Sequence, residues 1–206
     1  MKLAKALIHG GSEHRKFLRQ IMVSVDITAP LYWWKEFDTY KVGTVANSTS
    51  TMHKMAEKPI TIDCFEIDDY NPAIKDNKNI YATDVHKEIS GYIDFLEHLR
   101  KWHLSYLELA KNASDSESAE FYNKLAKDYW KELIRWLPES WLQTRTVTMN
   151  YENLLGMCSR GQRRFHKLNE WSGKDNPQLI NFISFARELP YAEDFIFFDI
   201  AENETE

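Results

Sequence analysis

Five potential cations fall within eight residues at positions 160–167. They are Arg160, Arg163, Arg164, His166 and Lys167. An arginine guanidinium can form paired, planar hydrogen bonds with a phosphate group, and a lysine adds a point charge. The cluster therefore predicts a phosphate site, and the solvated end of a helix is the alternative.

Residues 42–52 form a second polar segment, rich in hydroxyl and amide groups and poor in bulky side chains. Its polar members include Thr44, Asn47, Ser48, Thr49, Ser50 and Thr51. This composition is typical of a loop that hydrogen-bonds a ligand. An ordinary solvated loop has the same composition, so both interpretations stay open.

Common catalytic motifs are missing from the sequence. It contains no G-x-G-x-x-G, G-x-x-x-x-G-K-[ST], H-E-x-x-H or G-x-S-x-G pattern, so dinucleotide-binding, P-loop, zincin and hydrolase-elbow sites lose their support. His98 and His103 are five residues apart and do not share a helix face, and no metal site is predicted. Cys64 and Cys158 form neither a disulfide framework nor a cysteine zinc site.

Length and charge limit the classes of protein that remain. The 206 residues, 43% hydrophobic and 28% charged, fit one sizeable domain over 1–206, with a frayed acidic tail at about 199–206. A net charge of −5 argues against general nucleic-acid binding. No segment has the roughly 18 apolar residues of a membrane span. We therefore expect a soluble protein, and a cytoplasmic one because no cysteine framework is present.

Hydrophobic periodicity predicts a mixed α/β (α+β) fold. Apolar and polar residues alternate over 21–28, which indicates a half-buried strand, and Pro30 then begins a helix over 31–39. Long helices are expected at 83–111 and from the capping box Ser114-x-x-Glu117 to a stop at Pro138. The remaining elements are expected as strands at 60–67 and 144–148 and as helices at 151–160 and 177–189.

The segments up to residue 53 resemble, in order and spacing, the flavin-dependent thymidylate synthases, the ThyX family. His14 stands at the family's H-x-x-P-F-E-H segment, and the strand at 21–28 and the helix start Ala29-Pro30 follow as in the family. The signature R-H-R-x-x-S-x-N-x-x-S-x-R-Y is matched in part. Thr39-Tyr40-Lys41 stands at R-H-R and Met52-His53 at R-Y, while Thr44, Asn47 and, with one extra residue, Ser50 stand at the first serine, the asparagine and the second serine.

The resemblance continues to about residue 171. Trp136-Leu137-Pro138, Thr144-Arg145 and Thr148-Met149-Asn150 resemble the family's L-P, T-R and T-x-N segment. Residues 160–167, with Leu168-Asn169-Glu170-Trp171 after them, stand at its R-x-x-x-x-A-Q-W-E. The resemblance implies an antiparallel sheet flanked by long helices, assembled as a homotetramer with FAD sites between subunits. It also implies methylation of dUMP to dTMP with methylenetetrahydrofolate and NADPH-reduced flavin.

The resemblance also implies roles for single residues. Ser50 would be the catalytic residue against the nucleotide, with Thr51 beside it. Arg145 and one of Arg160, Arg163 or Arg164 would hold the phosphate or base of the nucleotide. The residues implied for the flavin are His14, Lys41, Thr44, Asn47 and Asn150.

Lys41 is the one cation left of R-H-R, and each charge-assisted hydrogen bond lost there is worth roughly 1.5–3 kcal/mol.

Three hypotheses about the function follow. The protein is an active, divergent thymidylate synthase; or it keeps flavin and nucleotide but acts on another substrate, such as a modified pyrimidine; or it is a non-catalytic regulator or inhibitor that binds a nucleotide or a protein partner.

Overall fold

The computed structural model describes residues 1–48, 55–67, 80–158, 165–174 and 180–198, with the backbone alone at 80–86. The chain divides into two compact units. One consists of Met1–Ser48 and Thr144–Glu206, and the other of Thr49–Gln143. That both units form one domain stays a prediction, and the acidic tail at 199–206 lies outside the described residues.

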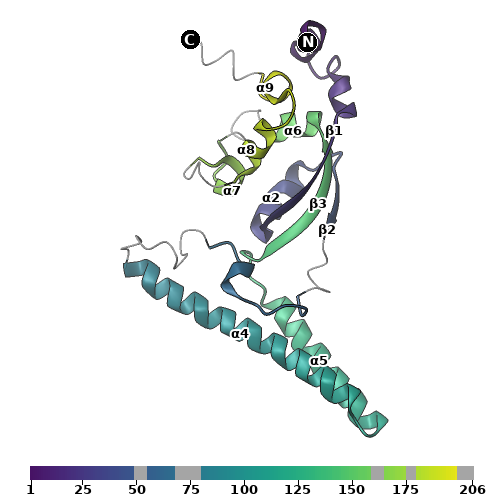
Figure 1. Ribbon diagram of the computed structural model, residues 1–206, viewed down its shortest axis with the longest axis vertical. Helices are drawn as coiled ribbons and strands as arrows, with labels where there is room; N and C mark the ends of the chain where they lie inside the picture. Colours follow the sequence, from purple (N-terminus) through teal and green to yellow (C-terminus); the bar gives the residue numbers. More distant parts are fainter. Residues whose placement is uncertain (49–54, 68–79, 159–164, 175–179, 199–206) are drawn as a thin grey trace. The chain divides into compact units, whose positions relative to one another are not determined.

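The first unit is built on a three-stranded sheet in the order β1-β3-β2 (Figure 1). β1 is Met22–Pro30, β2 is Val45–Ser48 and β3 is Leu142–Asn150. The strands predicted at 21–28 and 144–148 are confirmed. Residues 45–48 were expected as part of a loop, and that expectation is wrong, because these residues pair antiparallel with β3.

One face of this sheet packs on an aromatic core. β1 directs Val23, Val25 and Ile27 to the core. Its last residue, Pro30, keeps an extended conformation and is the N-cap of α2 (Leu31–Tyr40). The predicted helix at 31–39 is confirmed. The fully buried aromatic side chains of the unit are Trp33, Trp34, Phe37, Trp171 and Phe197.

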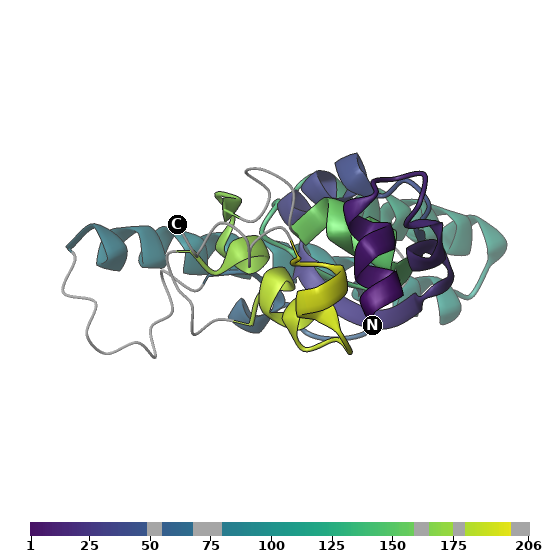
Figure 2. The ribbon, with the colours of Figure 1, turned by 90° about the horizontal axis from the view of Figure 1, so that it is seen from above.

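Short helices complete the first unit. The helix predicted at 151–160 is confirmed as α6 (Tyr151–Cys158). The helix predicted at 177–189 is shorter in its described part, because the side chain of Asn181 caps α8 (Phe182–Arg187). Not predicted were α1 (Lys2–His9), a 3-10 turn at Lys16–Gln20, α7 (Asn169–Ser172) and α9 (Ala192–Phe195). Figure 2 shows α1 beside α9, where Lys5 Nζ lies 2.5 Å from Asp194 Oδ1.

The second unit is a long helical hairpin of α4 (Ile80–Lys111) and α5 (Ser116–Arg135) (Figure 1). Both predicted long helices are confirmed. The predicted capping box Ser114-x-x-Glu117 is wrong by one residue, because the carboxylate of Asp115 caps α5 by accepting the Ser118 N–H at 2.8 Å. Within the described ranges, no helix combines the length and the apolar character of a membrane span.

Residues 60–67 cover one side of this hairpin and do not form the predicted strand. Ile62–Cys64 is a 3-10 turn, and Phe65 makes a single antiparallel bridge with Trp141. The buried side chains of Ile60 and Phe65 share a core with Leu96 of α4. The apolar run is therefore explained by packing on helices and not by a sheet.

Candidate functional site

Six of the predicted site residues lie in the described part of the chain. They are His14, Lys41, Thr44, Asn47, Arg145 and Asn150. The other five lie outside the described residues. They are Ser50, Thr51, Arg160, Arg163 and Arg164.

The pairing of β2 with β3 joins two segments that are about 100 residues apart in the sequence. Asn47 lies opposite Thr146, and Ser48 lies opposite Arg145. Residues 45–48 of the polar segment therefore form an edge strand directly beside residues 145–148 of the central strand β3.

Arg145 and Lys41 share one carboxylate, that of Asp38. Arg145 Nη1 lies 3.5 Å from Asp38 Oδ1, and Lys41 Nζ lies 3.3 Å from the same oxygen. The guanidinium of Arg145 also stacks on the Trp34 ring, 4.3 Å from its centroid. Asp38 therefore competes with any phosphate for both of these cations.

The turn between α2 and β2 is fixed by hydrogen bonds. Thr44 donates from its backbone N–H and from its hydroxyl to the Lys41 carbonyl, both at 2.8 Å. Gly43 has a φ of +82°, which other residues rarely adopt. Asn153 Nδ2 donates to the Val42 carbonyl at 2.7 Å and so ties the turn to α6. The Thr44 hydroxyl is therefore used to hold the turn.

Asn150 caps α6. Its Oδ1 accepts the Asn153 N–H at 3.0 Å, and Asn153 Oδ1 accepts the Asn150 N–H at 2.9 Å. Asn153 was not among the predicted residues, although the Asn150-x-x-Asn153 spacing is that of a reciprocal cap. The side-chain oxygen of Asn150 is therefore occupied, which leaves its amide NH2 group for a ligand.

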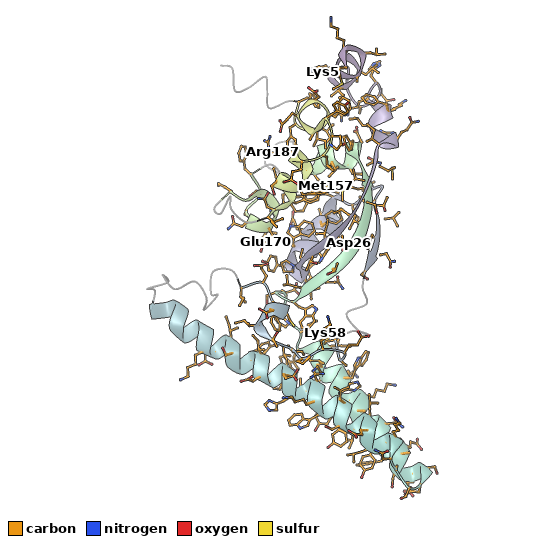
Figure 3. All side chains as sticks on the ribbon, in the orientation of Figure 1. Lys5, Asp26, Lys58, Met157, Glu170 and Arg187 are labelled. Carbon is orange, nitrogen blue, oxygen red and sulfur yellow. The ribbon has the colours of Figure 1, made fainter. Side chains whose placement is uncertain are left out.

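The face of the sheet away from the core is lined with hydroxyl groups. Ser24 bonds Thr148 at 3.2 Å, and Thr28 bonds Thr144 at 2.7 Å. Between these pairs, the Thr146 hydroxyl donates to Asp26 Oδ1 at 2.6 Å (Asp26 is labelled in Figure 3). Since Asn47 lies opposite Thr146, its exposed amide belongs to the same face.

His14 is exposed and lies in the turn between α1 and the 3-10 turn at Lys16–Gln20. In the sequence it is outside the segments that form β2 and β3. Its neighbour Arg15 is buried and forms a bidentate ion pair with Glu152 of α6. Arg15 Nε donates to Oε2 at 2.9 Å, and Nη2 donates to Oε1 at 3.1 Å. This pair fixes the turn that carries His14. Sequence reasoning missed it, because the two residues are 137 positions apart.

His166 anchors the described end of the basic stretch to α2. Its Nε2 lies 3.1 Å from Glu36 Oε1, and the Tyr40 hydroxyl donates to the same oxygen at 3.0 Å. The Leu168 N–H donates to His166 Nδ1, so the proton of the neutral ring is assigned to Nε2. One helix, α2, therefore contacts both Arg145 and the end of the basic stretch.

Neither a model of a known protein family nor a curated protein sequence matches this chain. In its fold the chain is similar to two solved structures of the flavin-dependent thymidylate synthase ThyX from Helicobacter pylori, both with FAD and dUMP. Each comparison covers 95% of this chain. The first covers 82% of the solved chain, with a TM-score of 0.46 and 17% sequence identity, and the second covers 81%, with a TM-score of 0.47 and 18% identity. What this chain binds must therefore follow from its own residues.

Proposed function

We propose that the protein binds FAD and dUMP and methylates dUMP to dTMP, with methylenetetrahydrofolate as carbon donor and NADPH as reductant. The observation that carries this proposal is the pairing of Val45–Ser48 with residues 145–148. It brings together the two segments for which the sequence resemblance implies ligand contacts. On this proposal both units belong to one ThyX-like domain, which acts in the cytoplasm as a homotetramer.

The described residues support a phosphate-bearing ligand beside Lys41 and Arg145. Lys41 is exposed, and the planar fork of Arg145 meets it at Asp38. Asn47 is exposed as well, but it shares the other face of the sheet with Thr146. Asn150 fits a flavin less well, because its side-chain oxygen caps α6. When bound, the flavin would supply the hydride chemistry, and the side chains of this chain would bind and orient the two ligands.

Roles for the other predicted residues rest on the resemblance. We assign Ser50 to the nucleotide as the catalytic residue, with Thr51 beside it, and His14 to the flavin or base. Of the basic stretch, one of Arg160, Arg163 or Arg164 would complete the phosphate site. The anchoring of His166 on α2 supports this assignment, because α2 also contacts Arg145.

A second candidate function is binding without catalysis, as a regulator or inhibitor. The observation that favours it is Asp38, whose carboxylate occupies both Lys41 and Arg145. A carboxylate that already pairs with both cations reduces the positive charge that they offer to phosphate groups, which suits one mononucleotide better than a nucleotide and a dinucleotide together. Flavin uptake separates the two functions, because a synthase is expected to bind FAD and turn yellow, whereas this binder is expected to take up dUMP alone.

Asp38→Asn is expected to tighten dUMP binding by about 3–10-fold, because it removes the anion that competes for Arg145 and Lys41. Arg145→Gln is expected to weaken binding by about 10–100-fold. Isothermal titration calorimetry measures both changes. Asp128→Asn, on the helical hairpin, makes the same change of net charge far from this site in the sequence and is expected to leave the affinity unchanged.

The phosphate assignment fails if Asp38→Asn and Arg145→Gln weaken dUMP binding equally while both variants keep the wild-type melting temperature. In that case the three side chains would serve only to order each other.

A further inference from the structure

Asn153 joins two segments to which the sequence resemblance assigns ligand contacts. On one side, its Oδ1 accepts the Asn150 N–H at 2.9 Å. On the other, its Nδ2 donates to the Val42 carbonyl at 2.7 Å, in the turn that follows Lys41. The two ends of one carboxamide therefore hold the start of α6 and this turn together.

The turn between α2 and β2 is of type II. The Thr44 N–H donates to the Lys41 carbonyl, which closes a four-residue turn, and Gly43 at its third position has a φ of +82°. Val42, at the second position, has a negative φ, because Tyr191 is the only non-glycine residue in the described ranges with a positive φ. A negative φ followed by a positive one defines type II, whereas type I needs a negative φ at both positions.

The hydrogen bond from Asn153 fixes the central peptide of this turn. That peptide points in opposite directions in types I and II, because ψ of the second residue differs by about 150° between them. The Val42 carbonyl can therefore reach Asn153 in the type II form only. Gly43 accepts either form, since glycine adopts positive and negative φ about equally well. The contact with Asn153, and not the turn's own sequence, therefore selects the type II form.

This turn carries Lys41 at its first position, directly after α2. Lys41 Nζ lies 3.3 Å from Asp38 Oδ1, and Arg145 Nη1 lies 3.5 Å from the same oxygen. Arg145 stands on β3, whose last residue, Asn150, caps the helix of Asn153. The bond from Asn153 to the turn therefore joins the backbone of Lys41 to the end of the strand that carries Arg145.

We infer that Asn153 is a positioning residue of the candidate site. It acts through the turn and not by contact with a ligand, because its Nδ2 holds the Val42 carbonyl and so keeps Lys41 in place beside Arg145. The role of Lys41 in binding rests on the proposed function, whereas the hold of Asn153 on the turn does not.

A second cap in the same unit shows how the two ends of the Asn153 carboxamide can be separated. α8 begins with an Asn181-x-x-Ser184 capping box, in which Ser184 Oγ accepts the Asn181 N–H at 3.1 Å and donates to the Asn181 carbonyl at 2.8 Å. Asn153→Ser would give α6 the same box with Asn150. Its hydroxyl proton would be used as in Ser184, and it has no carboxamide N–H for Val42. This variant therefore keeps the cap and releases the turn.

A double-mutant cycle on dUMP affinity tests the inference. By isothermal titration calorimetry, Lys41→Met is expected to raise the dissociation constant about 10-fold in the wild-type background, but less than about 3-fold in the Asn153→Ser background. Asn153→Ser alone is expected to raise it about 3–10-fold. Asn123→Ser, at an exposed position of α5, is the matched control and should leave both the affinity and the effect of Lys41→Met unchanged.

Hydrogen exchange at Thr44 provides a measurement that needs no ligand. Its N–H is protected by the bond to the Lys41 carbonyl, and Asn153→Ser is expected to speed its exchange at least about 5-fold. The melting temperature is expected to stay within about 4 °C of wild type, because one hydrogen bond is lost while the cap of α6 remains. If the serine variant does not fold, Asn153→Asp, which keeps an acceptor for the Asn150 N–H, replaces it.

Two results overturn the inference. One is wild-type exchange at Thr44 in the Asn153 variant, and the other is an equal effect of Lys41→Met in both backgrounds. A coupled cycle in a chain that binds dUMP without methylating it supports the inference and contradicts the synthase activity. If the wild-type chain does not bind dUMP, the proposed function fails, and the exchange at Thr44 alone decides whether Asn153 positions the turn.

Discussion

Replacing Arg100 with methionine is expected to lower the free energy of unfolding by about 3–5 kcal/mol. The guanidinium donates from Nε and Nη2 to the Glu97 carboxylate, each at 2.7 Å, and from Nη1 to the Ala56 carbonyl at 3.0 Å. The two side chains are only 9% and 14% exposed. Methionine would leave the buried Glu97 carboxylate with only the exposed Lys101, whose Nζ lies 3.8 Å from Oε1, as its counter-charge. Urea unfolding followed by circular dichroism measures the loss.

An exposed ion pair on the same hairpin provides the control. Arg135 pairs with Glu132 three residues earlier, but its side chain is 52% exposed. Arg135→Met is therefore expected to cost less than about 1 kcal/mol. Equal losses from the two arginine variants would show that burial does not decide the strength of these pairs.

The pH dependence gives an independent check on Arg100. Its hydrogen bond to Glu97, together with the hydrogen bond from the Ile60 N–H, holds the pKa of that carboxyl below its ordinary value of 4.5. A pKa that is lower in the folded state stabilises the protein fully above the unfolded pKa, and the stabilisation is lost as the pH falls through the folded pKa. The difference in stability between wild type and Arg100→Met should therefore narrow below about pH 4. A difference that stays constant down to pH 3 would contradict this assignment.

Trp33→Ala is expected to cost about 3–5 kcal/mol in the first unit. Trp33 is 1% exposed, and its ring lies 5.0–5.3 Å from those of Trp34, Phe37 and Trp171. Removing the indole opens a cavity that these rigid neighbours cannot close. Thermal or urea unfolding measures the cost, and a loss below about 1 kcal/mol would show that the core collapses into the space.

A phenylalanine variant separates the contribution of side-chain volume to stability from that of the indole N–H. Among the described residues, the Trp33 indole N–H is buried without a partner, whereas Trp171 Nε1 donates to the Met157 carbonyl at 3.3 Å. Trp33→Phe removes an unpaired donor, while Trp171→Phe leaves a carbonyl near the end of α6 without its donor. We expect Trp171→Phe to cost about 1 kcal/mol more than Trp33→Phe. The reverse order would contradict the assigned hydrogen bond.

Elements with a local cause were predictable from the sequence. The alternation over 21–28, the Ala29-Pro30 switch and the long apolar stripe of α4 each contain their own signal. β2 was not predictable, because Val45–Ser48 is a strand only through its pairing with residues 145–148. The apolar run at 60–67 was predicted as a strand but packs on a helical hairpin. No local pattern in the sequence indicates that its partner is a pair of helices.

The same distinction holds at the candidate site. Lys41 and Arg145 were found as cations in a matching order, but their carboxylate partner Asp38 was not. Asp38 is three residues before Lys41 on α2, and only the folded sheet brings Arg145 to it. The role of His166 was likewise hidden, because its partner Glu36 is 130 positions away.

Tritium release from 5-tritiated dUMP, in the presence of FAD, NADPH and methylenetetrahydrofolate, tests the proposed synthase activity most directly. Wild-type protein is expected to release tritium in proportion to NADPH oxidised, and Ser50→Ala is expected to lose this release while it keeps the wild-type melting temperature. Absence of dUMP-dependent NADPH oxidation and of tritium release, in a protein that is colourless and takes up no added FAD, would contradict the proposal.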